Sequence, residues 1–513
     1  MMTASVSAAE PSADPRRRER LAVGMLVVAA VLIRTVVFVC WEQSSFDSDQ
    51  AVVGLMAKHI SEGRAFPLFF YGQNYLLAVQ AWLAAPVFLV LGPTVLALKL
   101  PLLALNIVVA LLLVHLLQRD AGLRPAFAGL AATFFVLAPV GMSAQLMSAL
   151  GVSVEPFLYV LLIWMLRARP VWLGAVLGFG FLHREFTAYG FLALLAVGVF
   201  DRSIFTRKRL MELAVAIAVA VVLWNAVSAL RPYANAAGPG TTAANVAGTP
   251  NNLRGLLDRV CSDPRRIVKG LGQLFSSFLG LPMGLTPALL GDLNVNSLRA
   301  QGAPWLWPLF GLACLAGLIR VAWRFRAGPD TRAPSAWAFP AYLFVTGMIT
   351  ALAYNAGRCG DLHVLTLRYA LLVILAPIGL AAAWLRVESR LRVRAGVVAF
   401  LGVWSVYSLA GHGRLLNEYV RHTPPAYRRV VADYLVAHRI ELARSDYWTG
   451  YHVTFLARER VVVATDGVWR VLSYHEREKA NPGLAYTISR RPCPDGRGVE
   501  VYPGVYWVCD PSG

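Results

Sequence analysis

The sequence predicts an all-α polytopic membrane protein with about eleven transmembrane helices and a small α+β C-terminal domain. Of its 513 residues, 57% are hydrophobic and 15% are charged, whereas soluble domains carry about a quarter charged residues. The hydrophobic residues also fall in long blocks, and a helix of ~20 apolar residues spans a bilayer. These observations exclude a soluble multidomain enzyme.

The formal net charge of +19 raises the question of a nucleic-acid partner. The basic residues argue against one, because they cluster between hydrophobic blocks, at 16–20, 167–169, 202–209, 320–332 and 386–394. Such clusters mark the cytoplasmic ends of membrane helices, and we find no nucleic-acid motif. We therefore expect a bacterial inner-membrane protein with a cytoplasmic N-terminus and a periplasmic C-terminus.

The predicted domains follow from this topology. Residues 1–20 form a cytoplasmic tail, 21–411 the transmembrane domain and 412–513 a periplasmic domain, with a helix at Tyr427–Ala443 and a strand at Arg460–Thr465. The predicted spans are 21–41, 94–117, 125–141, 155–168, 210–230, 304–323, 335–354, 368–385 and 395–411, with 171–200 as two short helices.

Two outer loops are expected, at 42–93 and 231–303. Within the first, residues 73–91 are predicted to form an interfacial helix. A crossing there would place the basic end of the next span outside, against the positive-inside rule.

The six cysteines are not spaced as metal ligands usually are. Cys493 and Cys509 would face the periplasm, where disulfides persist. A hairpin disulfide between them and a pair of free thiols both stay open, since sequence does not give connectivity.

The first outer loop carries two carboxylates two residues apart, Asp47 and Asp49. At a membrane surface, one can take a proton from a hydroxyl as general base while the other orients that hydroxyl or binds a divalent cation. The structural alternative is that Ser48 or Asp49 caps a helix beginning near Gln50.

The loop then continues through His59-Ile60-Ser61-Glu62-Gly63, Phe66-Pro67 and Phe70-Tyr71-Gly72-Gln73-Asn74-Tyr75. In its order and topology this arrangement resembles the GT-C superfamily of membrane glycosyltransferases. The nearest group is the bacterial one related to the mannosyl- and aminoarabinose-transferring enzymes. The resemblance covers residues 20–200 well and the later spans in general layout. It implies inverting transfer of a sugar from a polyprenyl-phosphate donor to an envelope glycan, lipid or protein acceptor on the outer face.

The resemblance also assigns roles in the first loop. It places the general base at Asp49, with Asp47 as the second choice, and it puts Tyr71 and Gln73 in the active-site crevice. Gln50, Gln73 and Gln80 stand where relatives often carry acidic residues. These departures from the pattern remove carboxylates that could bind a metal, so whether a divalent metal takes part stays open.

Ionisable residues lie beside two predicted spans. Glu155 opens a span, which suits either a helix start favoured by the dipole or a residue lining the crevice. His183-Arg184-Glu185 separates two apolar runs, where charged groups are costly and usually functional. We expect His183 and Glu185 to line the crevice and Arg184 to face the donor phosphate. An internal ion pair between the short helices is the alternative.

A last cluster, Arg358, His363, Arg368 and Tyr369, lies at the outer end of the 368–385 span. Guanidinium groups bind phosphate in a bidentate manner, and the superfamily often has an Arg-Tyr pair there. We expect Arg368, assisted by Arg358, to bind the donor phosphate and Tyr369 to line the crevice. Snorkelling of Arg368 to the interface is the alternative.

The aromatic stretch 446–452 in the C-terminal domain suits either stacking on a sugar or an interfacial or core role. Two other functions also stay open. A lipid or sugar transporter would show repeats and discontinuous helices, and we find no internal repeat. A polysaccharide polymerase or ligase usually carries its large catalytic loop in the C-terminal half of the membrane region, whereas the acidic pair here lies in the first loop.

Overall fold

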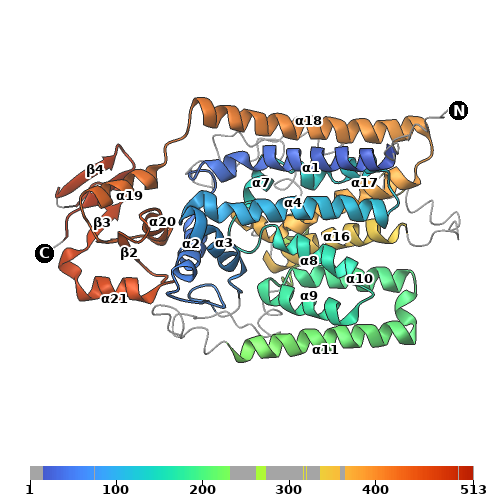
Figure 1. Ribbon diagram of the computed structural model, residues 1–513, viewed down its shortest axis with the longest axis horizontal. Helices are drawn as coiled ribbons and strands as arrows, with labels where there is room; N and C mark the ends of the chain where they lie inside the picture. The colour runs from blue at the N-terminus through green and yellow to red at the C-terminus, as the bar shows by residue number, and fades with distance from the viewer. Residues whose placement is uncertain are drawn as a thin grey trace, which may run out of the picture.

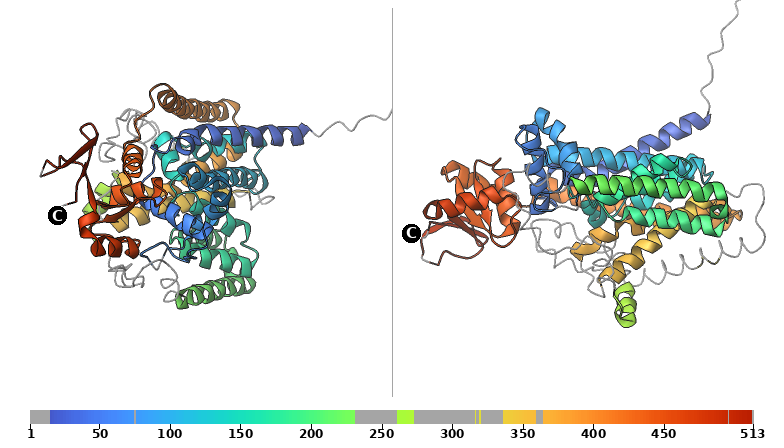
Figure 2. Two further views of the ribbon diagram at one scale, coloured as in Figure 1. Left: turned by 60° about the vertical axis from the view of Figure 1, so that its left-hand side comes forward. Right: turned by 90° about the horizontal axis from the view of Figure 1, so that it is seen from below.

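The computed structural model describes residues 15–73, 76–230, 261–272, 316, 319, 336–358, 364–494 and 496–511, with 364–367 described by their backbone alone. Almost all of the predicted outer loop 231–303 and span 304–323, the cluster at 320–332, and His363 lie outside these residues. The described chain forms an elongated helical body with the C-terminal domain at one end (Figures 1 and 2).

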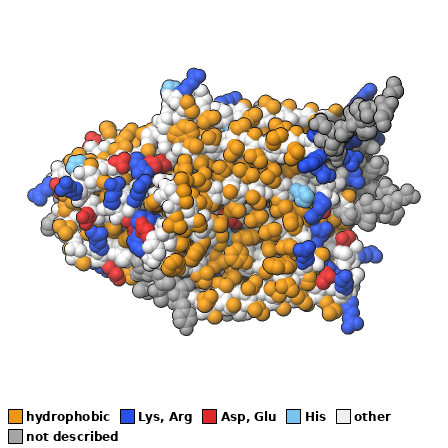
Figure 3. Space-filling model, in the orientation of Figure 1, with side chains coloured by type: hydrophobic (Ala, Val, Ile, Leu, Met, Phe, Trp, Pro, Cys, Tyr) orange, Lys and Arg blue, Asp and Glu red, His pale blue; other side chains and the backbone are white. Residues whose placement is uncertain are grey.

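Apolar helices build the helical body. Among the described residues, five helices are long and apolar enough to cross a membrane: Arg16–Cys40 in α1 (Pro15–Cys40), α4 (Val95–Arg119), α11 (Arg207–Ala229), Arg368–Val387, and α18 (Leu391–Arg421). Four shorter apolar helices accompany them, α3 (Val79–Leu91), α8 (Glu155–Met165), α9 (Pro170–His183) and α10 (Thr187–Phe200). Hydrophobic side chains cover this part of the surface in a broad belt (Figure 3). The predicted helical membrane domain is therefore supported, whereas its number of spans stays a prediction.

The short helices clarify three predictions. The expected pair at 171–200 is confirmed as α9 and α10. Helix α3, with 13 residues, is too short for a straight crossing, so an interfacial position for it remains open. The single span expected at 125–141 is wrong: the chain forms α5 (Pro125–Ala131), α6 (Thr133–Val136) and α7 (Val140–Leu146). Pro139 separates the last two, because it cannot donate the hydrogen bond that would continue a helix.

The predicted spans at 335–354 and 368–385 lie side by side. Helix α16 (Ala338–Arg358) follows the first. The second begins as a 3-10 helix, η5 (Val364–Ile374), and continues as α17 (Leu375–Val387). Gly347 and Gly379 are the close contacts, since a Cβ on either would lie within 2.5 Å of backbone in the neighbouring helix. The end of this pair that is predicted to face outward carries Arg358 and Arg368.

Basic loops meet at the end of the body remote from the C-terminal domain, where Lys and Arg side chains gather (Figure 3). Arg209 donates from Nη1 to the Arg167 carbonyl oxygen at 2.5 Å, and Arg167 lies 3.8 Å from Asp120. The amide of Ala126 also donates to Glu19 at 3.3 Å. Clusters far apart in sequence thus share one end, as the positive-inside interpretation requires.

The C-terminal domain is α+β, as predicted. Helix α18 continues past the expected limit of 411 to Arg421 before the domain begins. Its elements are α19 (Tyr427–Ala437), β1 (Leu442–Ser445), α20 (Tyr447–Leu456), β2 (Val462–Thr465), α21 (Leu472–Ala480), η6 (Pro482–Leu484), β3 (Tyr486–Ser489), β4 (Gly498–Tyr502) and β5 (Tyr506–Cys509). The helix expected at Tyr427–Ala443 is too long, because Leu442 and Ala443 already belong to β1.

One mixed sheet organises this domain, in the order β2-β1-β3-β5-β4. Strand β1 pairs parallel with β2 and β3, whereas β5 pairs antiparallel with β3 and β4. A disulfide joins Cys493 to Cys509, with the Cα atoms 5.5 Å apart. Of the two alternatives that the sequence left open for these cysteines, the structure has the disulfide.

Candidate active site

Helix α2 (Ser48–Ser61) presents the acidic pair of the first loop. Its N-cap is Asp47, whose side chain accepts a hydrogen bond from the Gln50 amide at 3.0 Å. Ser48 and Asp49 were the expected caps, so that prediction is wrong by one or two residues. Burial raises the pKa of Asp47, and the charge of Asp49 raises it further. Because the cap occupies Asp47, Asp49 in the first helical turn remains for other partners.

Asp49 joins three distant parts of the chain. Its Oδ1 accepts a hydrogen bond from the Tyr447 hydroxyl in α20 at 2.6 Å. Its Oδ2 lies 3.7 Å from Nη1 of Arg368, at the start of the Arg368–Val387 span. The Asp49 side chain is 13% exposed. This leaves a largely enclosed carboxylate with a hydrogen-bond donor on one oxygen and a cation near the other.

Arg368 belongs to a cluster of cations and aromatic rings. Its Nη2 donates to the Tyr369 hydroxyl at 3.3 Å, and its guanidinium lies 5.2 Å from the centre of the Tyr369 ring. The Arg358 guanidinium lies 5.0 Å from the same ring. Phe186 from the α9–α10 corner also packs against that ring, at 6.0 Å. The structure therefore brings Arg358, Arg368 and Tyr369 together beside Asp49.

The α9–α10 corner is held by its polar residues. Arg184 donates from Nε to the Gly151 carbonyl at 3.3 Å and from Nη2 to the Leu150 carbonyl at 3.1 Å. His183 is buried and hydrogen-bonds through Nδ1 to the Tyr159 hydroxyl at 2.8 Å, while Glu185 is exposed. Arg184 thus connects the corner to the loop before α8, and a route to the phosphate remains a prediction.

Glu155 forms the first residue of α8 and is buried. It accepts hydrogen bonds from Gln80 of α3 and from the Ser153 hydroxyl, the latter at 3.1 Å. Glu155 therefore lies at the helix start, as one alternative expected, and its carboxylate is already held by two polar side chains. Its role as a crevice-lining residue stays a prediction. The contact also fixes α3 against α8.

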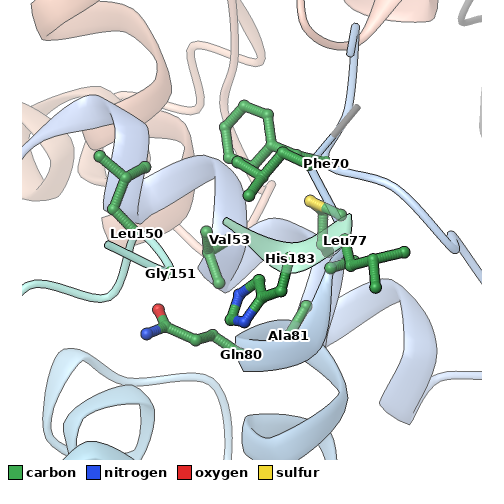
Figure 4. Close-up of a pocket in the computed structure, with 11 residues that line it drawn as sticks. Val53, Phe70, Leu77, Gln80, Ala81, Leu150, Gly151 and His183 are labelled. Atoms are coloured by element: carbon green, nitrogen blue, oxygen red, sulfur yellow. The ribbon is translucent and has the colours of Figure 1, made fainter. Parts of the chain in front are cut away.

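A narrow pocket lies beside this contact, lined by Val53, Met56, Phe70, Leu76, Leu77, Ala78, Gln80, Ala81, Leu150, Gly151 and His183 (Figure 4). Its volume of about 10 Å³ is that of a single water molecule. Among the described residues, Gln80 Oε1 and His183 Nε2 are buried without a hydrogen-bond partner. This pocket is too small for a sugar or a lipid chain.

A buried lysine organises the other side of α2. Lys99 of α4 donates from Nζ to Gln50 Oε1 and to the Met147 carbonyl, each at 2.5 Å. Gln50 Oε1 also accepts from the Ala149 amide at 3.0 Å. The side-chain oxygen of Gln50 therefore accepts hydrogen bonds from two donors. Sequence reasoning missed Lys99, although a charged residue inside an apolar span is a usable signal.

Tyr71 and His59 connect the first loop to the C-terminal domain. The Tyr71 hydroxyl and His59 Nδ1 are 2.8 Å apart, and His59 Nε2 lies 2.9 Å from Glu459. Glu459 also pairs with Lys58 at 2.6 Å and with Arg64. Burial would raise the pKa of Glu459, but hydrogen bonds and charges from His59, Arg64 and Lys58 outweigh it and hold that pKa far below its usual range.

Gln73 follows the tight turn at Gly72, which has a φ of +68°. Its amide donates to the Phe70 carbonyl at 2.9 Å. A Cβ on Gly72 would lie 3.1 Å from the Trp469 carbonyl oxygen, so the turn lies directly against the C-terminal domain. Glycine suits both the positive φ and the close approach.

Sequence reasoning missed the C-terminal residues of this site: Tyr447, Glu459, and Arg470, whose Nε donates to the Tyr447 hydroxyl oxygen at 3.3 Å. The stretch 446–452 had been noted only for its aromatic residues. For a metal, the described residues hold no group of three or more His, Cys, Asp or Glu side chains suited to bind one. The metal question therefore stays open.

No protein-family model and no curated protein matches the chain. Two solved structures are similar along its length: ArnT from Cupriavidus metallidurans in the apo state and the same protein bound to undecaprenyl phosphate. The first has 13% identity, a TM-score of 0.45, and coverage of 95% of this chain and 98% of that one. The second has 12% identity, a TM-score of 0.42, and coverage of 97% and 98%.

Proposed function

We propose that this chain is a membrane glycosyltransferase that moves a sugar from a polyprenyl-phosphate donor to an acceptor hydroxyl, with Asp49 as general base. One observation carries the proposal. The Asp49 carboxylate at the start of α2 and the Arg368 guanidinium at the end of a candidate span converge, with 3.7 Å between Oδ2 and Nη1. A base and a phosphate-binding cation are the two groups that such a transfer requires.

The geometry fits a single displacement. Asp49 Oδ1 is occupied by the Tyr447 hydroxyl, whereas Oδ2 remains available to accept the proton of the acceptor hydroxyl. The acceptor oxygen then attacks the anomeric carbon as the bond between that carbon and the phosphate oxygen breaks. The polyprenyl phosphate leaves with the bonding electrons, and the acceptor proton stays on Asp49. A single displacement inverts the anomeric configuration.

The cation cluster suits the leaving group. Arg368 and Arg358 both lie against the Tyr369 ring, at the outer end of adjacent helices where a lipid phosphate would sit. Charge that develops on the departing phosphate is stabilised by a preorganised guanidinium in a site with little water. Arg184 is a further candidate, held at the neighbouring corner by carbonyl oxygens.

The acidic pair gives the first test. Asp49→Asn is nearly isosteric, and we expect transfer to fall by about 10²-fold or more, the usual scale for losing a general base. Asp47→Asn should have a small effect, because asparagine caps a helix as well as aspartate. The measurement is release of polyprenyl phosphate from polyprenyl-phosphate mannose and polyprenyl-phosphate glucose, together with mass spectrometry of envelope glycans in cells.

The two variants act as matched controls for each other. If Asp47→Asn abolished transfer and Asp49→Asn did not, the base would be Asp47. If neither variant changed any envelope glycan while deletion of the protein altered lipid or sugar export, the transporter interpretation would replace this one.

A further inference from the structure

Within the function proposed above, we propose that Tyr447 of the C-terminal domain is a positioning residue for Asp49. On this view the catalytic centre is complete only while the C-terminal domain is docked on the first outer loop. The domain would then be part of the catalytic machinery rather than an attached module.

The start of α20 holds Tyr447 in a fixed place. Asp446 caps this helix, accepting hydrogen bonds from the amides of Trp448 at 2.8 Å and Thr449 at 3.1 Å. The Tyr447 ring lies edge-on to Trp448 and Tyr451, with centroids 5.2 and 5.4 Å away. Its hydroxyl therefore reaches Asp49 from a rigid element.

Arg470 sets the direction of the Tyr447 proton. Its Nε donates to the Tyr447 oxygen at 3.3 Å, so the hydroxyl proton is directed to Asp49. The Arg470 guanidinium lies 5.1 Å from the centre of the Phe70 ring in the first loop and 5.8 Å from that of Tyr447. Burial and the charge of Asp49 raise the pKa of Tyr447, which keeps the hydroxyl protonated and therefore a donor.

Two contacts fix the C-terminal domain against the first loop, one from α20 and one from α19. The neighbouring Ser48 hydroxyl donates to the Trp448 carbonyl at 2.8 Å. Farther out, Arg429 forms a two-pronged contact with Glu42, at 2.7 and 2.5 Å. Together with the Glu459 cluster, these contacts fix the position of the C-terminal domain on the first loop, and this position brings Tyr447 to Asp49.

The hydrogen bond has a direct consequence for catalysis. By holding Oδ1, Tyr447 fixes the rotation of the carboxylate and keeps Oδ2 toward the acceptor. Without it, the carboxylate can turn, and Oδ2 is no longer held toward the acceptor. Misorientation of a reacting group by about 1 Å can cost on the order of 10²-fold in rate.

Tyr447→Phe removes the hydroxyl and keeps the ring. With polyprenyl-phosphate mannose and polyprenyl-phosphate glucose as probes, we expect kcat to fall by roughly 10- to 100-fold. The donor KM should stay within about twofold, because the lost hydrogen bond is to Asp49 and not to the Arg368 cluster proposed to bind the donor phosphate. Tyr502→Phe in β4 is the matched control and should leave both constants unchanged. Amide exchange of α20 should be the same in both variants, which separates loss of the bond from loss of docking.

A double-mutant cycle shows whether Tyr447 acts through Asp49. If it does, Asp49→Asn combined with Tyr447→Phe should be no slower than Asp49→Asn alone, because the positioned group is already lost. Defects that multiply would overturn the inference. So would a fully active Tyr447→Phe beside an impaired Asp49→Asn, which would leave the proposed function intact. Full activity in both single variants would remove the proposed function as well.

Discussion

At the residue scale, Asp49 lies between a neutral donor and a cation. The Tyr447 bond at 2.6 Å is short enough to orient the carboxylate, whereas Arg368 at 3.7 Å is close enough for charge attraction but too far for a direct hydrogen bond. Arg368 therefore keeps guanidinium donors for another anion. This distribution of contacts suits a base next to a phosphate site.

The same distances lead to a prediction for Arg368. A guanidinium can grip two phosphate oxygens, whereas an ammonium acts as a point charge. We expect Arg368→Lys to lower kcat/KM for the polyprenyl-phosphate probes about tenfold, and Arg368→Ala by 10²- to 10³-fold, with unchanged accumulation in the membrane. Arg394→Lys is the control, since its guanidinium lies 4.3 Å from the Phe127 ring at the basic end. Wild-type donor kinetics in Arg368→Lys would favour simple snorkelling.

Part of this site was predictable from the sequence for a physical reason. Arg368 lies at the end of an apolar block, where a guanidinium suits a lipid phosphate. The family resemblance of the first loop singled out Asp49, and the same resemblance marked the Arg368-Tyr369 pair. The sequence does not indicate a contact between Tyr447 and Asp49, because the two residues are 398 positions apart and Tyr447 lies in the C-terminal domain, outside the apolar blocks. Only the fold shows that the two meet.

At the element scale, α2 packs against α20 through a glycine. A Cβ on Gly54 would lie 2.5 Å from the ring of Phe455, which is 1% exposed. Phe46 and Phe88 flank that ring at 5.7 and 6.3 Å, so it has little room to move. The closeness of the two helices therefore depends on the missing side chain.

We expect Gly54→Leu to weaken the docking of the C-terminal domain by about 1–3 kcal/mol, the usual cost of overpacking. Limited proteolysis of the purified protein should then release the C-terminal domain sooner. Gly24→Leu in α1 is the matched control, because a Cβ there meets no atom within 4 Å. Equal protease resistance in the two variants would mean that Gly54 does not limit the approach.

The Glu459 cluster predicts a pH dependence of the same contact. This carboxylate contacts Lys58, His59, Arg64 and Tyr474. Behind them, Tyr71 bonds to His59 and Glu62 pairs with Lys58. Its folded pKa is depressed, so its stabilising contribution is fully present above the unfolded value of about 4.3. That contribution is lost as the pH falls through the lower folded pKa.

Glu459→Gln should therefore lower the stability of the docked domain by about 3 kcal/mol at pH 7 and reduce the loss seen on acidification below about pH 4. Thermal unfolding between pH 7 and pH 3 measures both effects. Glu441→Gln is the control, since Glu441 pairs with Arg477 on the surface and its side chain is 73% exposed, where such pairs contribute little. Identical pH profiles for wild type and Glu459→Gln would contradict this role.

The helices also show where local sequence stops being informative. Thr94 and Thr206 cap α4 and α11 through their side chains, a signal visible in the sequence. The break at Pro139 was visible too, but the hydrophobic run across it resembled a single span. The 3-10 geometry of η5 has no such signal, because the residues of this segment also suit an α-helix.

At the scale of the whole molecule, charge and redox chemistry define two ends. Basic loops share one end, whereas α2, which carries Asp49, lies with the C-terminal domain at the other (Figures 1 and 3). The disulfide between Cys493 and Cys509 lies in this second part, and disulfides persist in oxidising compartments. The positive-inside rule and the disulfide thus independently favour a periplasmic active site.

This orientation is the last prediction. Alkaline phosphatase fused after the C-terminal domain should be active, because the domain would lie in the periplasm, whereas fusions at Arg202 and Arg390 should be inactive. Green fluorescent protein at the same three points should give the opposite pattern and serves as the control. In cells, Cys493 and Cys509 should resist a thiol reagent until a reductant is added. A cytoplasmic reading at the C-terminus with both thiols reactive would mean an odd number of miscounted spans, with 79–91 the first to reconsider, and it would place Asp49 away from a periplasmic acceptor.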